Sequence, residues 1–315
     1  MTSAQPRPSR PTSAQRLAPF TTFKLGGLCR GVVTCTNRRE LVQAVRDLQA
    51  VGDAFTLIGG GSNLLVSDHG LDQVVIRYYS EKPLVAREGN NLVVQASTLL
   101  DDFVAFTVQE GLDGMVACSG IPGTVGGAIT GNAGAFGEQI GDHLVSATLV
   151  DRAGNEWDVN RDDLEFAYRS SKLQRSDAYV AAARFRLKPG LRERMRAQRQ
   201  EIMQLRSAKH PDWRRVPTAG SFFKNIEPTS KAERRQAAGW FLEQAGAKSL
   251  RVGGAHTFSE HANIIVADAG CTASDVYELS LQMAALVKDR FRLVLQPEVQ
   301  MLGSFGNTKT SPQTD

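Results

Sequence analysis

Hydrophobic positions alternate between a helical and a strand-like spacing along much of the chain. Apolar residues recur with the period of a helix after Asn37 and Glu40, which together form a typical helix start. An apolar run of strand length follows over 54–58. The same order returns with a strand over 91–97 and a helix that begins near Thr98. This alternation predicts mixed α and β structure.

The rest of the chain is expected to form strands first, and then strands and helices in turn. Expected strands lie at 144–150, 156–160, 179–187, 220–225, 262–267 and 292–302. Expected helices lie at 191–208, 230–246 and 273–291, the last with Thr272 and Asp275 as a capping pair. The pattern predicts two α+β lobes, at about 19–80 and 81–208, followed by a smaller α/β domain at 209–302.

The two ends of the chain differ in composition from the part between them. Pro6, Pro8 and Pro11 lie among serines and threonines, and the segment 303–315 is similarly polar. Such segments bury too little apolar surface to order themselves. We therefore expect a disordered arm over 1–18 and a disordered tail over 303–315.

Composition and charge narrow the class of protein. The chain has 315 residues, 42% of them hydrophobic and 22% charged, which is enough for domains with real cores. Its formal charge of +4 is spread along the chain apart from a basic cluster at 191–200, so we expect no nucleic-acid partner. Four scattered cysteines lack zinc or redox spacing, and no signal peptide or long apolar run is present. We expect a cytoplasmic protein without membrane insertion.

Glycine is concentrated in two segments. Ten of the 29 glycines lie between Gly111 and Gly141, and "LIGGGSNLLVSD" places three more directly after an apolar strand. Glycine lets backbone N–H groups approach a ligand closely, and successive N–H groups form an anion-binding nest. Tight turns are the alternative for both segments. Neither segment contains the dinucleotide fingerprint of the doubly wound fold or a Gly-Lys-Ser/Thr motif. Two such nests suit the diphosphate of a dinucleotide such as FAD.

Six motifs together resemble one known family. "FTTFKLGG", "LIGGGSNLLVSD", "SGIPGTVGGAITGNAGAFG", "YRSSKL", "PTAGSFFKN" and "LQPEVQML" occur in the order typical of the UDP-N-acetylenolpyruvoylglucosamine reductases. The resemblance covers about 20–302. It implies a two-lobed FAD-binding region at 19–208, of the vanillyl-alcohol-oxidase or PCMH type, and a substrate-binding domain at 209–302. It also implies that NADPH reduces bound FAD, which then reduces UDP-N-acetylglucosamine enolpyruvate to UDP-N-acetylmuramate for peptidoglycan synthesis.

The resemblance implies roles for three catalytic residues. Arg169 would hold the substrate carboxylate, because a guanidinium stays charged and binds a carboxylate through two hydrogen bonds. Ser221 would protonate the enolate, a role that needs nearby cations such as Lys209 or Lys224. Glu298 would help to polarise or protonate the enolate, which requires partial desolvation to raise its pKa.

The resemblance also implies the binding residues. The cofactor-binding positions are Gly59, Gly60, Gly61, Ser62, Asn63, Ser119, Gly120, Ile121, Gly123, Thr124, Gly126 and Gly127. The substrate-binding positions are Tyr168, Lys209 and Asn225. Some family members carry an extra loop with a substrate-binding tyrosine, but only 52 positions separate Arg169 from Ser221. The chain therefore resembles the form without that loop.

The residues alone also allow other hypotheses about function. His210, His256 and His261 lack the spacing and carboxylate or cysteine partners of a metal site, so we expect no metal. A different flavin oxidoreductase on the same fold is one alternative, although the motifs "GSFFKN" and "PEV" together are not expected in it. A non-catalytic nucleotide-binding protein is the other.

Overall fold

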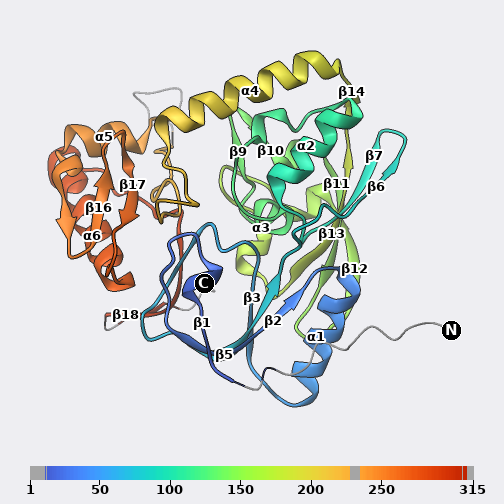
Figure 1. The fold of residues 1–315 in the computed structure, drawn as a ribbon, viewed down its shortest axis with the longest axis horizontal. Helices are drawn as coiled ribbons and strands as arrows, with labels where there is room; N and C mark the ends of the chain where they lie inside the picture. The colour runs from blue at the N-terminus through green and yellow to red at the C-terminus, as the bar shows by residue number, and fades with distance from the viewer. Residues whose placement is uncertain (1–10, 12, 228–234, 307, 311–315) are drawn as a thin grey trace.

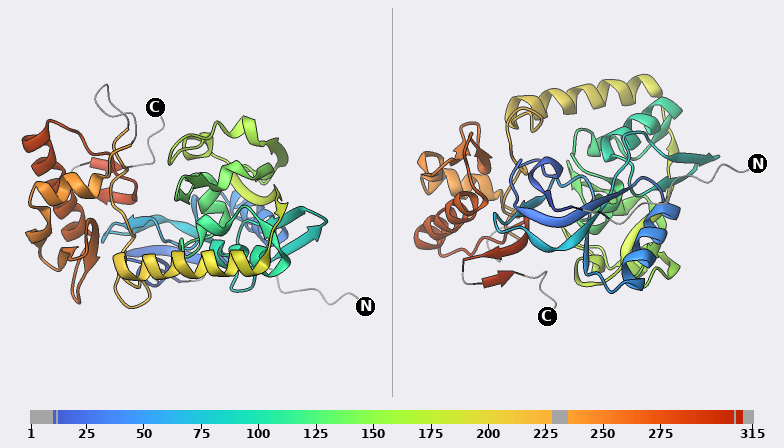
Figure 2. Two further views of the ribbon diagram at one scale, coloured as in Figure 1. Left: turned by 90° about the horizontal axis from the view of Figure 1, so that it is seen from above. Right: turned by 60° about the horizontal axis from the view of Figure 1, so that its bottom comes forward.

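The computed structural model describes residues 11, 13–227, 235–306 and 308–310. Figure 1 shows two lobes built on separate sheets and a third, C-terminal lobe beside them. Helix α4 (Arg192–Lys209) runs along the edge of the molecule from the second lobe toward the C-terminal lobe (Figures 1 and 2). No helix in the described ranges is long and apolar enough to cross a membrane.

The first lobe is a four-stranded sheet flanked by one helix. Its strand order is β1 (Gln15–Arg16), β2 (Leu28–Cys35), β5 (Leu71–Tyr78), β3 (Phe55–Ile58), with β2, β5 and β3 parallel. Helix α1 (Arg38–Ala50) begins where the sequence predicts it, because the Asn37 side chain accepts a hydrogen bond from the Glu40 N–H. The buried face of α1 packs into the same core as β2 and β5.

The second lobe is a five-stranded antiparallel sheet covered by helices. Its strand order is β12 (Glu156–Asn160), β11 (Leu144–Val150), β13 (Tyr179–Arg186), β7 (Asn91–Gln95), β6 (Val85–Glu88). The covering helices are α2 (Leu100–Glu110) and α3 (Val125–Thr130). Short strand pairs are β8 (Leu112–Asp113) with β14 (Lys188–Pro189), and β9 (Gly134–Ala135) with β10 (Glu138–Gln139). One continuous hydrophobic core joins this lobe to the first.

The C-terminal lobe packs two helices on a small sheet. The sheet consists of β15 (Arg251–Val252), β16 (Ala255–Phe258) and β17 (His261–Ala267), and the helices are α5 (Ala238–Gln244) and α6 (Ala273–Phe291). Thr272 and Asp275 form the predicted capping box of α6. Single 3₁₀ turns elsewhere lie at Ala18–Phe20, Val116–Cys118, Ile140–Asp142, Arg161–Leu164, Lys172–Arg175 and Ala247–Ser249.

The C-terminal lobe is joined to the first lobe by a strand that directly follows the first glycine segment in the sequence. Strand β18 (Gln300–Phe305) pairs in parallel with β4 (Leu64–Val66), which follows that segment in the sequence. The Asp68 carboxylate accepts hydrogen bonds from the N–H groups of Ala273 and Ser274, each at 2.9 Å. A carboxylate at the N-terminus of a helix is stabilised by the unpaired N–H groups there. These contacts hold the third lobe against the first.

The structure corrects the predicted ends of the ordered chain. Residues 1–10 and 12 of the predicted arm lie outside the described residues, but β1 within it pairs with β2, so the arm ends before residue 18. The predicted tail over 303–315 is also too long, because β18 extends to Phe305 and pairs with β19 (Thr308–Thr310). Main-chain hydrogen bonds between strands give these segments a regular structure that their composition did not predict.

Three predicted elements of the C-terminal part are shorter than expected. Residues 220–225 form only isolated bridges, because both the N–H and the C=O of Phe223 bind the side chain of Asn263. The predicted strand over 292–302 begins only at Gln300 (Pro297, just before it, has no N–H to donate). Part of the predicted helix over 230–246 lies outside the described residues, and the described part is helical only from Ala238.

Candidate active site

The two glycine segments pack against each other. A Cβ on Gly59 would lie 2.4 Å from Thr124 Oγ1, and a Cβ on Gly123 would lie 2.5 Å from Ser62 Oγ. The Ser62 hydroxyl donates a hydrogen bond of 3.1 Å to the Pro122 carbonyl. Side chains at the glycine positions would separate the segments. The two predicted nests therefore form one surface.

The first segment fits the diphosphate of FAD. No hydrogen bond between described residues uses the backbone N–H groups of Gly60, Gly61 or Ser62 as donors. Three adjacent donors, two of them on glycines without a Cβ, are what an anion nest requires. These residues would hold the cofactor.

The second segment uses most of its N–H groups within the chain. Gly120 donates to Asp101 Oδ1 at 2.7 Å, and Gly126 donates to the Ala96 carbonyl at 2.9 Å. Ile121 and Gly127 also have partners, Cys118 and Thr124. The tight turn that composition left open is therefore part of the explanation for these glycines. Cofactor contact by the segment stays a prediction.

Gly61 allows a direct test of the first segment. Its φ is +63°, the same as that of Gly89, but a Cβ on Gly61 would lie 1.9 Å from the Phe20 carbonyl oxygen, whereas Gly89 has open space. An alanine at either position costs about 1 kcal/mol for the left-handed backbone. Because of the clash, we expect Gly61→Ala to lower the free energy of unfolding by roughly 2 kcal/mol more than Gly89→Ala does. We also expect Gly61→Ala to lose bound FAD. Urea unfolding and FAD content of Gly61→Ala and Gly89→Ala would measure this, and equal values for the two variants would refute it.

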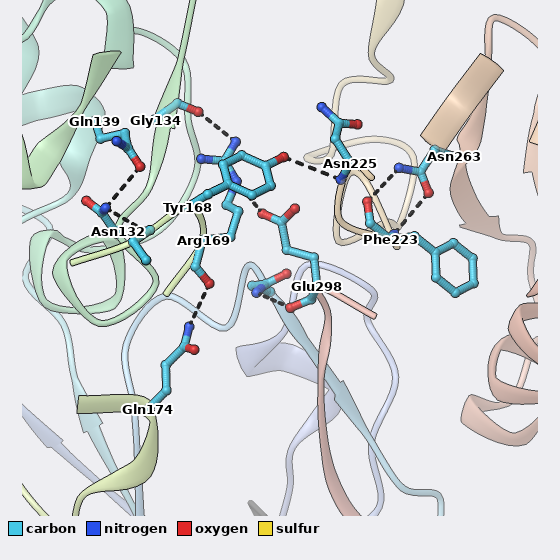
Figure 3. A network of polar contacts seen from close by, with 12 residues as sticks. Asn132, Gly134, Gln139, Tyr168, Arg169, Gln174, Phe223, Asn225, Asn263 and Glu298 are labelled. Carbon is cyan, nitrogen blue, oxygen red and sulfur yellow. Dashed lines mark hydrogen bonds and ion pairs between the residues drawn. The ribbon is translucent and has the colours of Figure 1, made fainter. Parts of the chain in front are cut away.

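Arg169 and Glu298 meet at the centre of the site. Arg169 Nε lies 2.9 Å from Glu298 Oε1, and Arg169 Nη2 donates a hydrogen bond of 2.7 Å to the Gly134 carbonyl (Figure 3). The Nε to Oε1 contact is an ion pair without hydrogen-bond geometry, so Nε has no hydrogen-bond partner among the described residues. Arg169 has a left-handed φ of +51°, which costs energy in a non-glycine residue. The two predicted catalytic residues, from different lobes, are thus brought together.

Burial changes the chemistry of Glu298. It raises the pKa of this carboxyl above its ordinary value, while the charges of Arg169 and Lys224 act in the opposite direction. The raised pKa is what the predicted role in proton transfer requires. The sequence indicates Lys224 only as a lysine near Ser221, because an electrostatic effect on Glu298 across 74 positions has no local signal.

The raised pKa of Glu298 predicts a pH dependence of stability. The folded protein binds a proton at Glu298 more tightly than the unfolded chain does. The resulting stabilisation is complete below the ordinary pKa and is lost as the pH rises through the folded-state pKa. From about pH 4 to about pH 8, the free energy of unfolding of the wild type should fall relative to that of Glu298→Gln. Urea denaturation over this range would measure it, and a constant difference between the two proteins would contradict it.

Ser221 lies on the segment that holds the backbone of Glu298. The N–H of Glu298 donates a hydrogen bond of 2.7 Å to the carbonyl of Phe222, and the N–H of Lys224 donates one of 2.9 Å to Gln296. The motifs "GSFFKN" and "PEV" therefore run side by side. The Ser221 hydroxyl forms no hydrogen bond with a described residue, so its proton is not committed to another group there.

Two of the three predicted substrate residues, Tyr168 and Asn225, contact each other beside Arg169. The N–H of Asn225 donates a hydrogen bond of 3.4 Å to the hydroxyl of Tyr168 (Figure 3). Asn225 Oδ1 accepts a hydrogen bond of 3.2 Å from the N–H of Ala238, so this side chain also fixes the start of α5. Lys209 is the last residue of α4. Burial, together with neighbouring charges that include Lys209, lowers the pKa of His210 to about 4.

An open groove elsewhere does not coincide with this site. It has a volume of about 540 Å³ and lies between α2 and α4, where Val108, Arg199 and Met203 line it. It contains no predicted catalytic, cofactor-binding or substrate-binding residue.

Two family models match this chain, one over its N-terminal half and one over its C-terminal domain. The family model of an FAD binding domain matches residues 29–160, and that of the UDP-N-acetylenolpyruvoylglucosamine reductase C-terminal domain matches 210–302. A reductase of that name from Synechococcus sp. (strain JA-3-3Ab) is 36% identical over 289 residues, which are 92% of this chain and 90% of the relative. The one from Lachnoclostridium phytofermentans is 33% identical over 93% of each chain.

A solved structure shares the whole fold. The crystal structure of UDP-N-acetylenolpyruvylglucosamine reductase from Thermus caldophilus superposes with a TM-score of 0.76 at 30% sequence identity. The match covers 92% of this chain and 98% of that chain. The likeness therefore includes all three lobes.

Proposed function

Because the chain belongs to the UDP-N-acetylenolpyruvoylglucosamine reductase family and is an FAD-dependent oxidoreductase, we propose that it reduces UDP-N-acetylglucosamine enolpyruvate to UDP-N-acetylmuramate. NADPH is the proposed hydride source and the cytoplasm the proposed location. The observation that carries the proposal is the Arg169–Glu298 pair, which lies beside Tyr168 and Asn225 and combines a fixed cation with a desolvated carboxyl group.

The cofactor and the protein have different tasks in this reaction. FAD, when bound, supplies a carrier that accepts hydride from NADPH and passes it to the substrate. The N–H groups of Gly60, Gly61 and Ser62 would hold its diphosphate, because they have no partners among the described residues. The side chains supply placement, charge and a proton.

Arg169 is proposed to neutralise the charge that develops on the substrate. Hydride addition to the terminal enolpyruvyl carbon places negative charge on the neighbouring carbon and its carboxylate, as an enolate. A guanidinium held by the Gly134 carbonyl and by Glu298 keeps a fixed position against that carboxylate. Such a preorganised cation stabilises the enolate more than the substrate, whose double bond carries no charge before hydride addition.

Ser221 is proposed to deliver the proton that completes the reaction. Its Oγ–H bond breaks as the enolate carbon takes the proton, and the alkoxide is neutralised by a proton from solvent or from protonated Glu298. The positive charge of Lys224, which also lowers the pKa of Glu298, would stabilise the alkoxide until then. The raised pKa of Glu298 increases its protonated fraction above that of an ordinary glutamate.

Two additions to the purified protein would test this proposal. Anaerobic NADPH should bleach the flavin absorbance, and UDP-N-acetylglucosamine enolpyruvate should then restore it with formation of UDP-N-acetylmuramate. NADH in a parallel sample measures the nicotinamide preference. Bleaching by NADPH that the UDP-sugar cannot reverse would reject the proposed substrate.

A further inference from the structure

Three arginines contain buried nitrogen atoms without a hydrogen-bond partner. Of the four such side-chain atoms among the described residues, three are the Nε atoms of Arg77, Arg169 and Arg206. Arg169 Nε still has Glu298 as its ion-pair partner, and Arg77 stacks on Tyr79 with its guanidinium carbon 3.8 Å from the ring centroid. Arg206 has no ion pair with any described residue. Among the described residues, Arg206 is thus the one of these three arginines with neither an ion-pair partner nor an aromatic ring against its guanidinium.

Arg206 lies on the face of α4 that meets the second glycine segment. Arg199, seven residues earlier and so about two helical turns away, forms a two-pronged pair with Asp101 at 2.6 and 2.9 Å. Asp101 in turn accepts the hydrogen bond from Gly120. Arg199 thus fixes the glycine segment through a carboxylate, whereas Arg206 pairs with no carboxylate of the described residues.

The absence of a side chain on Gly120 lets Arg206 reach this position. A Cβ on Gly120, whose φ is +72°, would lie 2.8 Å from Met203 Sδ and 3.0 Å from Arg206 Cδ. The arginine stem therefore lies directly over the segment predicted to bind the cofactor. Its environment also includes Cys118 and the catalytic Arg169.

The positive charge of Arg206 would be stabilised by an anionic ligand. Burial lowers its pKa most, the nearby cation Arg169 lowers it further, and Cys118 and Asp101 act in the opposite direction. A buried cation without an anionic partner is costly, and the cost falls when a ligand supplies the negative charge. A phosphate group binds a guanidinium through charge-assisted hydrogen bonds.

We propose that Arg206 binds a phosphate oxygen of a diphosphate ligand lying between the segment 119–127 and Arg169. The diphosphate of FAD is the expected source, because Arg206 contacts the glycine segment itself. NADPH and the UDP-sugar also contain diphosphates, and both of these alternatives rest on the proposed function.

Charge variants of α4 test this inference with FAD binding as the first readout. Arg206→Met keeps much of the packing volume and removes the charge, Arg206→Lys keeps the charge, and Arg196→Gln changes an exposed arginine of the same helix that pairs with Glu193. Flavin fluorescence during reconstitution gives the FAD Kd, and circular dichroism confirms folding. Steady-state kinetics at saturating FAD give KM for NADPH and the UDP-sugar.

We expect Arg206→Met to weaken FAD binding by about 10-fold or more, Arg206→Lys to restore part of the loss, and Arg196→Gln to bind FAD as the wild type does. An unchanged FAD Kd with a KM raised about 10-fold for one other ligand would support diphosphate binding and assign it to that ligand. A folded Arg206→Met variant with FAD Kd and both KM values within about twofold of wild type would overturn the proposal. So would equal losses in Arg206→Met and Arg196→Gln.

Discussion

Replacing Ser221 with alanine is expected to slow the recovery of flavin absorbance by the UDP-sugar roughly 10²- to 10⁴-fold, the range for loss of a general acid. Bleaching by NADPH should stay within about twofold of the wild-type rate, because hydride uptake by the cofactor needs no proton from Ser221. Anaerobic stopped-flow absorbance measures the two half-reactions separately. The two half-reactions should therefore respond differently, because the proposed proton transfer from Ser221 belongs only to the second.

The matched control for this experiment is Ser259→Ala. Ser259 is exposed between β16 and β17 and donates a hydrogen bond to Glu260. It should react at the wild-type rate in both half-reactions. Recovery at the wild-type rate in Ser221→Ala would remove Ser221 from the mechanism, and equal slowing of both half-reactions would point to a folding or binding defect.

Replacing Arg169 with lysine is expected to lower kcat/KM for the UDP-sugar by roughly 10²- to 10³-fold, as for loss of a preorganised charge donor. The guanidinium reaches the Gly134 carbonyl through Nη2 and Glu298 through Nε at the same time. A single ammonium group cannot keep both contacts and still bind a carboxylate through two parallel hydrogen bonds. Because the lost interaction is strongest with the enolate, kcat should fall as well as kcat/KM.

Steady-state kinetics of Arg169→Lys and of Arg175→Lys measure this effect. Arg175 lies at the end of the 3₁₀ turn that follows Arg169, outside the site, so its lysine variant should keep the wild-type constants. Wild-type kcat with only a raised KM in Arg169→Lys would show that this arginine binds the ground state alone.

Local patterns in the sequence predict much of the fold. The caps at Asn37 and Thr272 and the helix over 273–291 depend on neighbouring residues, and the structure confirms them. The FAD-binding fold of the PCMH type, implied by the motifs, is confirmed by the matching family model and the solved relative. Elements determined by distant contacts were less predictable, as in 220–225, where the side chain of Asn263, 40 positions away, binds the backbone of Phe223.

The candidate site shows the same division between local and distant information. The glycine segments are visible in the sequence because each needs several glycines within a few positions. The meeting of Arg169 with Glu298 has no local pattern, because 129 positions separate them. The resemblance implies that both belong to one site, and only the fold shows the distance of 2.9 Å between them. For the same reason the charge of Lys224 at Glu298 and the place of Arg206 over Gly120 appear only in three dimensions.

A crystal structure of the FAD complex tests the central claim most directly, namely that the glycine segments and the Arg169–Glu298 pair form one site. We predict that the FAD diphosphate lies against the N–H groups of 60–62 and that the flavin ring faces Arg169, Ser221 and Glu298. FAD bound in the groove between α2 and α4, or a flavin ring directed away from these three side chains, would contradict the account.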